Sequence, residues 1–198
     1  MPRRSYDHYC AASRALEVIG DRWSLLIVRE LLSGPRRYSD LFADLPGIST
    51  DVLAARLKDL ERDGILSRHR IGPRATSAYE LTAEGSTLRP VLEALSRWGT
   101  PLLGDRRPTD AVRAHWLALP LGRALADRVG TGTVTVRIGE TTFHVVIDAA
   151  GISHHDGPAP GPAEELTLDL ATANAVANGT LPLAEAAPDL ARQTAENA

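Results

Sequence analysis

The chain has 198 residues, of which 43% are hydrophobic and 24% are charged. These values are ordinary for a globular protein and argue against the disordered, fibrous and membrane classes. No stretch approaches the roughly 18 consecutive apolar residues of a membrane span, and the N-terminus lacks the apolar run of a secretory signal. We therefore expect a cytoplasmic protein with no membrane partner.

The sequence contains a single cysteine, Cys10. One cysteine excludes an intramolecular disulfide framework and sites built from several thiolates, such as zinc fingers and iron–sulfur clusters. The formal net charge is −3, but residues 1–104 carry a net charge of +2 and residues 105–198 a net charge of −5. This argues against a uniformly basic nucleic-acid binder and leaves room for a local basic patch. We place a domain boundary in the polar segment GDRRPTD at residues 104–110.

Four helices are predicted before the strands of the first region. The first spans residues 11–19 and ends at Gly20. Asp21 has the chemistry to cap a second helix, which stops before residues 34–35, and Ser39 has the chemistry to cap a short third one. The fourth begins at Ser49 and ends near residue 64. Its apolar face consists of Leu53, Leu57 and Leu60.

The pattern then changes to that of two strands joined by a short turn. Residues 65–79 contain Arg68, Arg70 and Arg74 and no acidic residue. Thr82 is expected to cap a last helix that Pro90 bends. We expect Trp23, Tyr38 and Trp98 to be core residues. The last helix carries a long apolar stripe, formed by Leu88, Val91, Leu92, Leu95 and Trp98.

This order of helices followed by a basic hairpin is that of a winged helix-turn-helix. In such a fold one helix, here about 49–63, enters the DNA major groove, and the wing, here about 68–77, contacts phosphates or the minor groove. The alternative is that these residues have no role in DNA binding. The polar residues would then only cap helices, and the arginines would be solvated surface residues. The candidate DNA-binding residues are Arg36, Arg37, Ser49, Thr50, Asp51, Arg56, Lys58, Arg68, Arg70 and Arg74.

Several long segments resemble the HxlR family of bacterial transcriptional regulators, relatives of the MarR-type winged helices. The resemblance lies in Cys10 and in four segments: IGDRWSLLIVRELLSGPRRYSDL, LPGISTDVLAARLKDLERDGIL, YELTAEG and LRPVLEALSRWG. It implies a homodimer on a palindromic operator, with the first and last helices of this region forming the dimer contact. It also implies that Cys10 is a candidate sensor of oxidants or electrophiles. The alternative is that Cys10 is a small buried hydrophobic residue.

The second region reads as a mixed domain. Residues 110–129 are helical in pattern and are expected to split at Pro120. Strands are predicted at 133–138, 141–148, 151–157 and 165–170, and two short helices follow. Ser153, His154, His155 and Asp156 include the residue types of a catalytic triad. Adjacent residues of a strand point to alternating faces, however, so we expect no triad and no metal pair here.

This region resembles the sterol-carrier-protein type-two-like domains. The resemblance lies in VTVRIGETTFHVVIDAAGIS, LTLDLATANAVANG and LPLAEA, and it implies an apolar tunnel between sheet and helices. The last strand of such domains is not evident, because residues 189–198 are polar. The domain either senses a hydrophobic small molecule or is an accessory domain that widens the dimer interface.

The sequence thus predicts an α+β protein. Residues 1–104 form a winged helix DNA-binding and dimerisation domain, and residues 105–198 form a small sterol-carrier-like domain whose antiparallel sheet has flanking helices. The predicted function is that of a homodimeric transcriptional regulator of double-stranded DNA, controlled by a hydrophobic small molecule or by Cys10 modification. The alternative is a carrier of an apolar small molecule whose winged helix binds protein. No enzymatic activity, cofactor or metal is expected.

Overall fold

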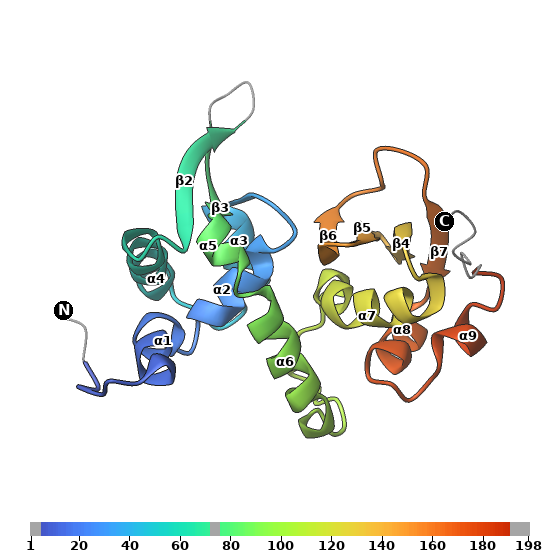
Figure 1. Ribbon diagram of the computed structural model, residues 1–198, viewed down its shortest axis with the longest axis horizontal. Coiled ribbons are helices and arrows are strands. Elements are labelled where there is room, and N and C mark those ends of the chain that lie inside the picture. The colour runs from blue at the N-terminus through green and yellow to red at the C-terminus, as the bar shows by residue number, and fades with distance from the viewer. Residues whose placement is uncertain (1–4, 72–75, 191–198) are drawn as a thin grey trace. The chain divides into compact units, whose positions relative to one another are not determined.

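The computed structural model describes residues 5–71 and 76–190 (Figure 1). The chain divides into two compact units, Met1–Leu92 and Glu93–Ala198. Within the described ranges, no helix combines the length and the apolar character needed to cross a bilayer. The fold is of the α+β class in both units, as the sequence predicts.

The first unit is a set of helices with one small sheet. Its elements are α1 (Ala11–Ile19), α2 (Ser24–Leu31), β1 (Arg36–Arg37), α3 (Tyr38–Asp44), α4 (Thr50–Arg62), β2 (Leu66–Ile71), β3 (Thr76–Leu81) and α5 (Ala83–Ser86). Helix α6 (Arg89–Gly99) begins in this unit and continues into the second. The strands of the first unit form an antiparallel sheet in the order β1-β3-β2.

The core of the first unit is built from the apolar faces of α2, α3 and α4. Ile27, Leu41 and Leu53 have no exposed surface, and Leu57 and Leu60 expose 1% each. The predicted stripe of α4 is therefore its buried face. Figure 1 shows α4 beside β2, with the β2–β3 hairpin extending beyond the helices of this unit.

Two of the expected helix starts are wrong by a few residues. Helix α2 begins at Ser24, because Asp21 caps a turn before it, where its Oδ1 accepts the N–H of Trp23 at 2.9 Å. Helix α3 begins at Tyr38 rather than after Ser39. Asp40 in its first turn accepts the N–H of Arg37 at 3.2 Å, which provides the cap that Ser39 was expected to give.

The expected single helix after Thr82 is two helices. Thr82 does cap α5, accepting the N–H of Gly85 at 3.0 Å. Helix α5 ends at Ser86, and Pro90 is the second residue of α6, where its missing N–H costs no helical hydrogen bond. Trp98 is not a core residue, since 70% of its surface is exposed.

The second unit continues from α6 through two short 3₁₀ turns, Thr100–Leu102 and Ala114–Leu117. Its remaining elements are α7 (Ala118–Val129), β4 (Gly132–Ile138), β5 (Thr141–Asp148), β6 (Gly151–Asp156), β7 (Glu164–Leu168), α8 (Leu170–Ala177) and α9 (Leu183–Ala186). The helical segment divides at residue 117 rather than at Pro120, which lies in the first turn of α7 and is tolerated there.

The sheet of the second unit has the order β6-β5-β4-β7. The prediction of a wholly antiparallel sheet is wrong in one pairing, because β7 runs parallel to β4, with Val136 opposite Leu166. The reason is the GPAPGP segment, which connects the β6 edge of the sheet to the β4 edge. That connection is anchored on the sheet, where the N–H of Ala159 donates to Thr135 Oγ1 at 3.2 Å.

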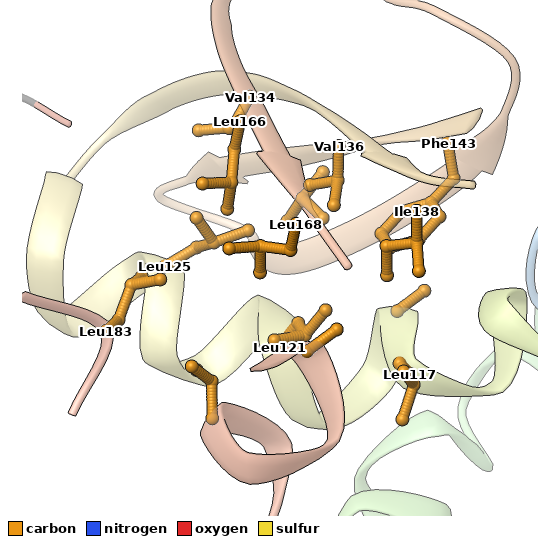
Figure 2. Packing of buried hydrophobic residues seen from close by; sticks show 14 of the residues in the cluster. Leu117, Leu121, Leu125, Val134, Val136, Ile138, Phe143, Leu166, Leu168 and Leu183 are labelled. Carbon is orange, nitrogen blue, oxygen red and sulfur yellow. The ribbon is translucent and has the colours of Figure 1, made fainter. Parts of the chain in front are cut away.

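The core of the second unit lies between the sheet and helices α7 to α9 (Figure 2). Leu121 and Leu125 of α7 point toward Val134, Val136 and the other inward side chains of the strands. Among the described residues, seventeen buried hydrophobic ones form this cluster. These side chains lie in the region where the sequence predicts an apolar tunnel. Most of residues 189–198, where the sequence shows no further strand, lies outside the described ranges.

Candidate nucleic-acid interface

Helices α3 and α4 form the two helices of a helix-turn-helix, and Tyr38 ties them together. The Tyr38 hydroxyl donates to the carbonyl oxygen of Thr50 at 2.9 Å, at the first residue of α4. Ser49 caps the same helix, with its Oγ accepting the N–H of Val52 at 3.3 Å. These two hydrogen bonds fix the N-terminal end of α4, which is the end that meets base edges in this class of fold. Ser49 thus has a structural role of its own.

The face of α4 opposite its leucines is solvent-exposed. It presents Thr50, Asp51 and Lys58 from the predicted set, and none of these side chains is buried. It also presents Val52, which is 38% exposed and was not among the predicted site residues. An exposed branched apolar side chain there is suited to contact with a thymine methyl group. The signal in the sequence was that Val52 falls outside the i, i+4, i+7 spacing of the buried leucines.

Arg56 is held within the protein. Its guanidinium lies 2.8 Å from Asp59 in the next turn and 3.8 Å from Asp21 before α2. Arg62 is likewise paired with Asp59 at 2.8 Å. Helix α4 carries three cationic and three acidic residues from Asp51 to Arg62, so its net charge is zero. Most of the attraction to phosphates is therefore expected to come from outside this helix.

The wing supplies that charge. Arg68 and Arg70 are opposite Tyr79 and Ser77 and share one face of the hairpin. Arg68 donates from Nε to Ser77 Oγ and lies 5.9 Å from the Tyr79 ring centre. Arg70 is exposed, and among the described residues it has no hydrogen bond or ion pair. Arg74 lies outside the described residues.

The remaining basic candidates lie on β1. Arg36 and Arg37 pair with Tyr79 and Ala78 of β3. They therefore lie on the edge strand of the sheet that is opposite β2. Arg36 is partly buried and donates to the carbonyl oxygen of Glu30 at 3.4 Å. Arg37 is exposed. The structure thus brings Arg36, Arg37, Arg68 and Arg70 onto one sheet, whose strand β2 contacts α4.

Cys10 precedes the first residue of α1 and is exposed. The backbone N–H groups of Ser13 and then Ala12 hold the pKa of its thiol below the ordinary value. Two residues close to Cys10 in the sequence have other partners: Arg14 pairs with Glu17 at 3.1 Å, and His8 Nδ1 lies 3.1 Å from Ser13 Oγ. Cys10 is not the buried hydrophobic residue of the alternative interpretation.

The candidate triad residues of the second unit point apart, as the alternation of a strand requires. His154 is opposite Val145 on the core side of the sheet and is buried. His155 is opposite His144 on the outer side, where the two rings stack at 5.2 Å. Neighbouring positions on opposite faces cannot form a common site with each other.

Helices α3 and α4 with the β2–β3 wing define a winged helix-turn-helix, a fold of transcriptional regulators. The comparison with known families agrees, since residues 18–106 match the family described as HxlR-like helix-turn-helix. The chain belongs to this family, and it is a helix-turn-helix transcriptional regulator.

Curated relatives carry the same description. The HTH-type transcriptional regulator sll1512 of Synechocystis sp. is 39% identical over 99 residues, which cover 48% of this chain and 72% of the relative. The regulator YvaP of Bacillus subtilis is 40% identical over 88 residues, covering 44% and 82%. Among solved structures, that of the putative regulator YtcD is 31% identical in sequence. The alignment covers 48% of this chain and 99% of the YtcD chain, with a TM-score of 0.45.

Proposed function

We propose that the protein is a homodimeric transcriptional regulator that binds palindromic double-stranded DNA through α4 and the β2–β3 wing. The observation that carries this proposal is the juxtaposition of two surfaces. One is the exposed face of α4, whose end is fixed by Tyr38 and Ser49. The other is the wing, which carries Arg70, an exposed residue with no partner among the described residues. The helix reads base edges, and the wing arginines bind phosphates.

The roles of the individual residues differ in this proposal. Thr50, Asp51, Val52 and Lys58 face the bases or the adjoining phosphates. Arg37, Arg68, Arg70 and Arg74 bind the backbone, with Arg36 at their margin. Arg56 orients α4 through its ion pairs and contributes least to DNA contact.

Dimerisation through α1 and α6 is supported by apolar side chains that α6 leaves exposed. Val91, Leu95 and Trp98 follow one another at helical spacing, and between 44% and 70% of each is exposed. Burying such a stripe against its symmetry mate would remove it from water, and two-fold symmetry would space the half-sites about 34 Å apart. We retain residues 1–104 as the DNA-binding and dimerisation domain and residues 105–198 as a sterol-carrier-like domain.

Two control signals remain part of the proposal. Cys10 is exposed and its thiol pKa is lowered, which favours the thiolate that reacts with electrophiles. A hydrophobic small molecule is the second signal. We propose that such a molecule binds to the second unit, whose core lies between the sheet and α7 to α9.

A salt titration tests DNA binding. Double-stranded fragments are selected from genomic DNA, and their affinity is followed by fluorescence anisotropy as the salt concentration rises. Arg70→Ala should weaken binding to all fragments and flatten the plot of log affinity against log salt by about one unit. Arg107→Ala removes an equal charge from an exposed ion pair with Asp110 and should leave the slope unchanged. A protein that prefers no fragment, even in dilute buffer, contradicts the proposal.

Cys10→Ser tests thiol control. The variant should bind the selected fragment as the parent does, but an electrophile such as a quinone should no longer release it. Release that is the same in both proteins would exclude Cys10 as the sensor.

A further inference from the structure

The second unit contains a hollow of about 100 Å³ between the C-terminal half of α6 and the start of α7. All of its lining residues belong to the unit Glu93–Ala198. Leu119, Pro120 and Ile152 give it an apolar wall. Arg97 of α6 and Arg123 of α7 give it two guanidinium groups. The lining of the hollow therefore combines apolar side chains with two cationic groups.

The described residues do not neutralise the two arginines. Both are exposed, and among the described residues neither has a hydrogen bond or an ion pair. Glu93 also lines the hollow, so the charge of its lining is +1. Elsewhere in this unit an exposed arginine does find a carboxylate, as Arg137 does with Glu165 at 3.1 Å. Two unpaired guanidinium groups over an apolar wall are suited to an organic anion, because a carboxylate accepts from both.

The size of the hollow limits the ligand. A cavity of about 150 Å³ in another protein accommodates benzene. A hollow of about 100 Å³ that opens to solvent therefore suits a small ring or branched chain whose charged end projects toward the rim. The hollow is too small to enclose a long lipid chain.

Helix α6 places the hollow opposite the exposed apolar stripe. Glu93, Arg97 and Thr100 line the hollow at a spacing of i, i+4, i+7. Val91, Leu95 and Trp98 of the stripe have the same spacing, and at 100° per residue their mean direction is about 160° away. One helix thus carries the hollow on one side and the proposed dimer contact on the other.

We propose that this hollow is a binding site for a small organic carboxylate, whose charged group is held by Arg97 and Arg123 and whose apolar part contacts Leu119, Pro120 and Ile152. The site deepens the proposed function, because it gives the effector a chemical class and a place. Ligand binding does not depend on DNA, so it is measured on the DNA-free protein.

Benzoate is the probe, and benzamide is its uncharged counterpart of the same shape. The full chain is titrated with each at constant ionic strength while the amide and arginine Nε–H resonances are followed by NMR. Benzoate should saturate with a dissociation constant on the order of 1 mM or lower, which is within reach of a ligand of this size. It should shift the resonances of Arg97 and Arg123. Benzamide should bind at least fivefold more weakly.

Arg97→Gln and Arg123→Gln should each weaken benzoate binding at least fivefold. Arg137→Gln, which removes the same charge from the outer face of the sheet, should not. The proposal is overturned if benzoate does not saturate, if benzamide binds equally well, or if the two hollow variants bind benzoate like the parent. Any of these results leaves DNA binding untouched, since the selected fragments are assayed without ligand.

Discussion

Gly85 is the position in the first unit where a side chain is least tolerable. A Cβ atom there would lie 1.9 Å from the carbonyl oxygen of Ile65, which is backbone and cannot rotate away. Gly85→Ala should therefore lower the free energy of unfolding of this unit by about 3 kcal/mol or more. The measurement is a urea titration followed at amide resonances of α4.

Gly99→Ala is the matched control, because no atom lies within 4 Å of the Cβ position at Gly99. That change should be neutral or slightly stabilising, since alanine is the better helix former. Equal midpoints for Gly85→Ala and the parent would show that α5 moves away from Ile65 without cost.

Single residues also show where sequence reasoning stops. The basic set could be named from the sequence, but the partners of its members could not. Arg56 is paired with Asp21, which is 35 positions away, whereas Arg70 is exposed without a partner in the described part. Trp98 was expected in the core because the spacing of apolar residues reveals a stripe without revealing what covers it.

At the scale of elements, the hydroxyl of Tyr38 joins α3 to α4. Tyr38→Phe removes its hydrogen bond to Thr50 and keeps the ring. A neutral hydrogen bond contributes about 0.5–1.5 kcal/mol, so affinity for a selected DNA fragment should fall about two- to tenfold. Tyr9→Phe makes the same chemical change at a fully exposed ring and should leave the affinity unchanged. Equal losses in both variants would remove Tyr38 from the interface.

Helix α8 has a cap that titrates. Asp169 accepts from the N–H of Thr172 at 2.9 Å and from its hydroxyl at 2.7 Å, and these bonds hold the pKa of the carboxyl below its ordinary value. The cap therefore stabilises the folded chain fully above the unfolded-state pKa of about 3.9, and this contribution is lost as the pH falls through the lower folded pKa.

Asp169→Asn keeps an acceptor that does not titrate. The parent should exceed this variant in urea midpoint near pH 6, and the difference should shrink below about pH 4. All other carboxylates titrate in both proteins and cancel. A difference that stays constant from pH 6 to pH 2 would contradict a charge-assisted cap.

Most elements could be predicted because their apolar spacing is regular, as in α4 with its three leucines. The errors in the predicted elements occur where a local sequence signal is compatible with two structures. Pro90 signals either a bend or a helix start, and the chain uses it as the second residue of α6. The parallel pairing of β7 with β4 depends on which edge of the sheet the chain reaches after the GPAPGP segment. The amino-acid sequence of β7 does not indicate that edge.

At the scale of the whole molecule, the exposed stripe of α6 predicts the state of assembly. Trp98→Glu places a charge in the proposed dimer contact, where 70% of the tryptophan is exposed in the single chain. The folded protein should become monomeric and lose affinity for palindromic fragments. A monomer has one copy of α4, which contacts only one half-site. Light scattering after size-exclusion chromatography gives the mass.

Leu170→Glu is the control for this experiment, since Leu170 is a partly exposed leucine of α8. It should leave the mass that of the parent. A parent protein that is itself monomeric, or a dimer that tolerates Trp98→Glu, would contradict the assembly through α6.

The parallel strand β7 has a consequence for synthesis and truncation. Strand β4 pairs on one side with β5, which follows it directly in the chain. On its other side it pairs with residues 164–168, which lie about 30 positions later. Until these residues leave the ribosome, the backbone groups along that edge lack partners beside the apolar side chains of Val134 and Val136. Unpaired edges of this kind recruit strands from other molecules. Fragments that stop before Leu168 are therefore expected to aggregate, and expression of the second unit should extend through α9.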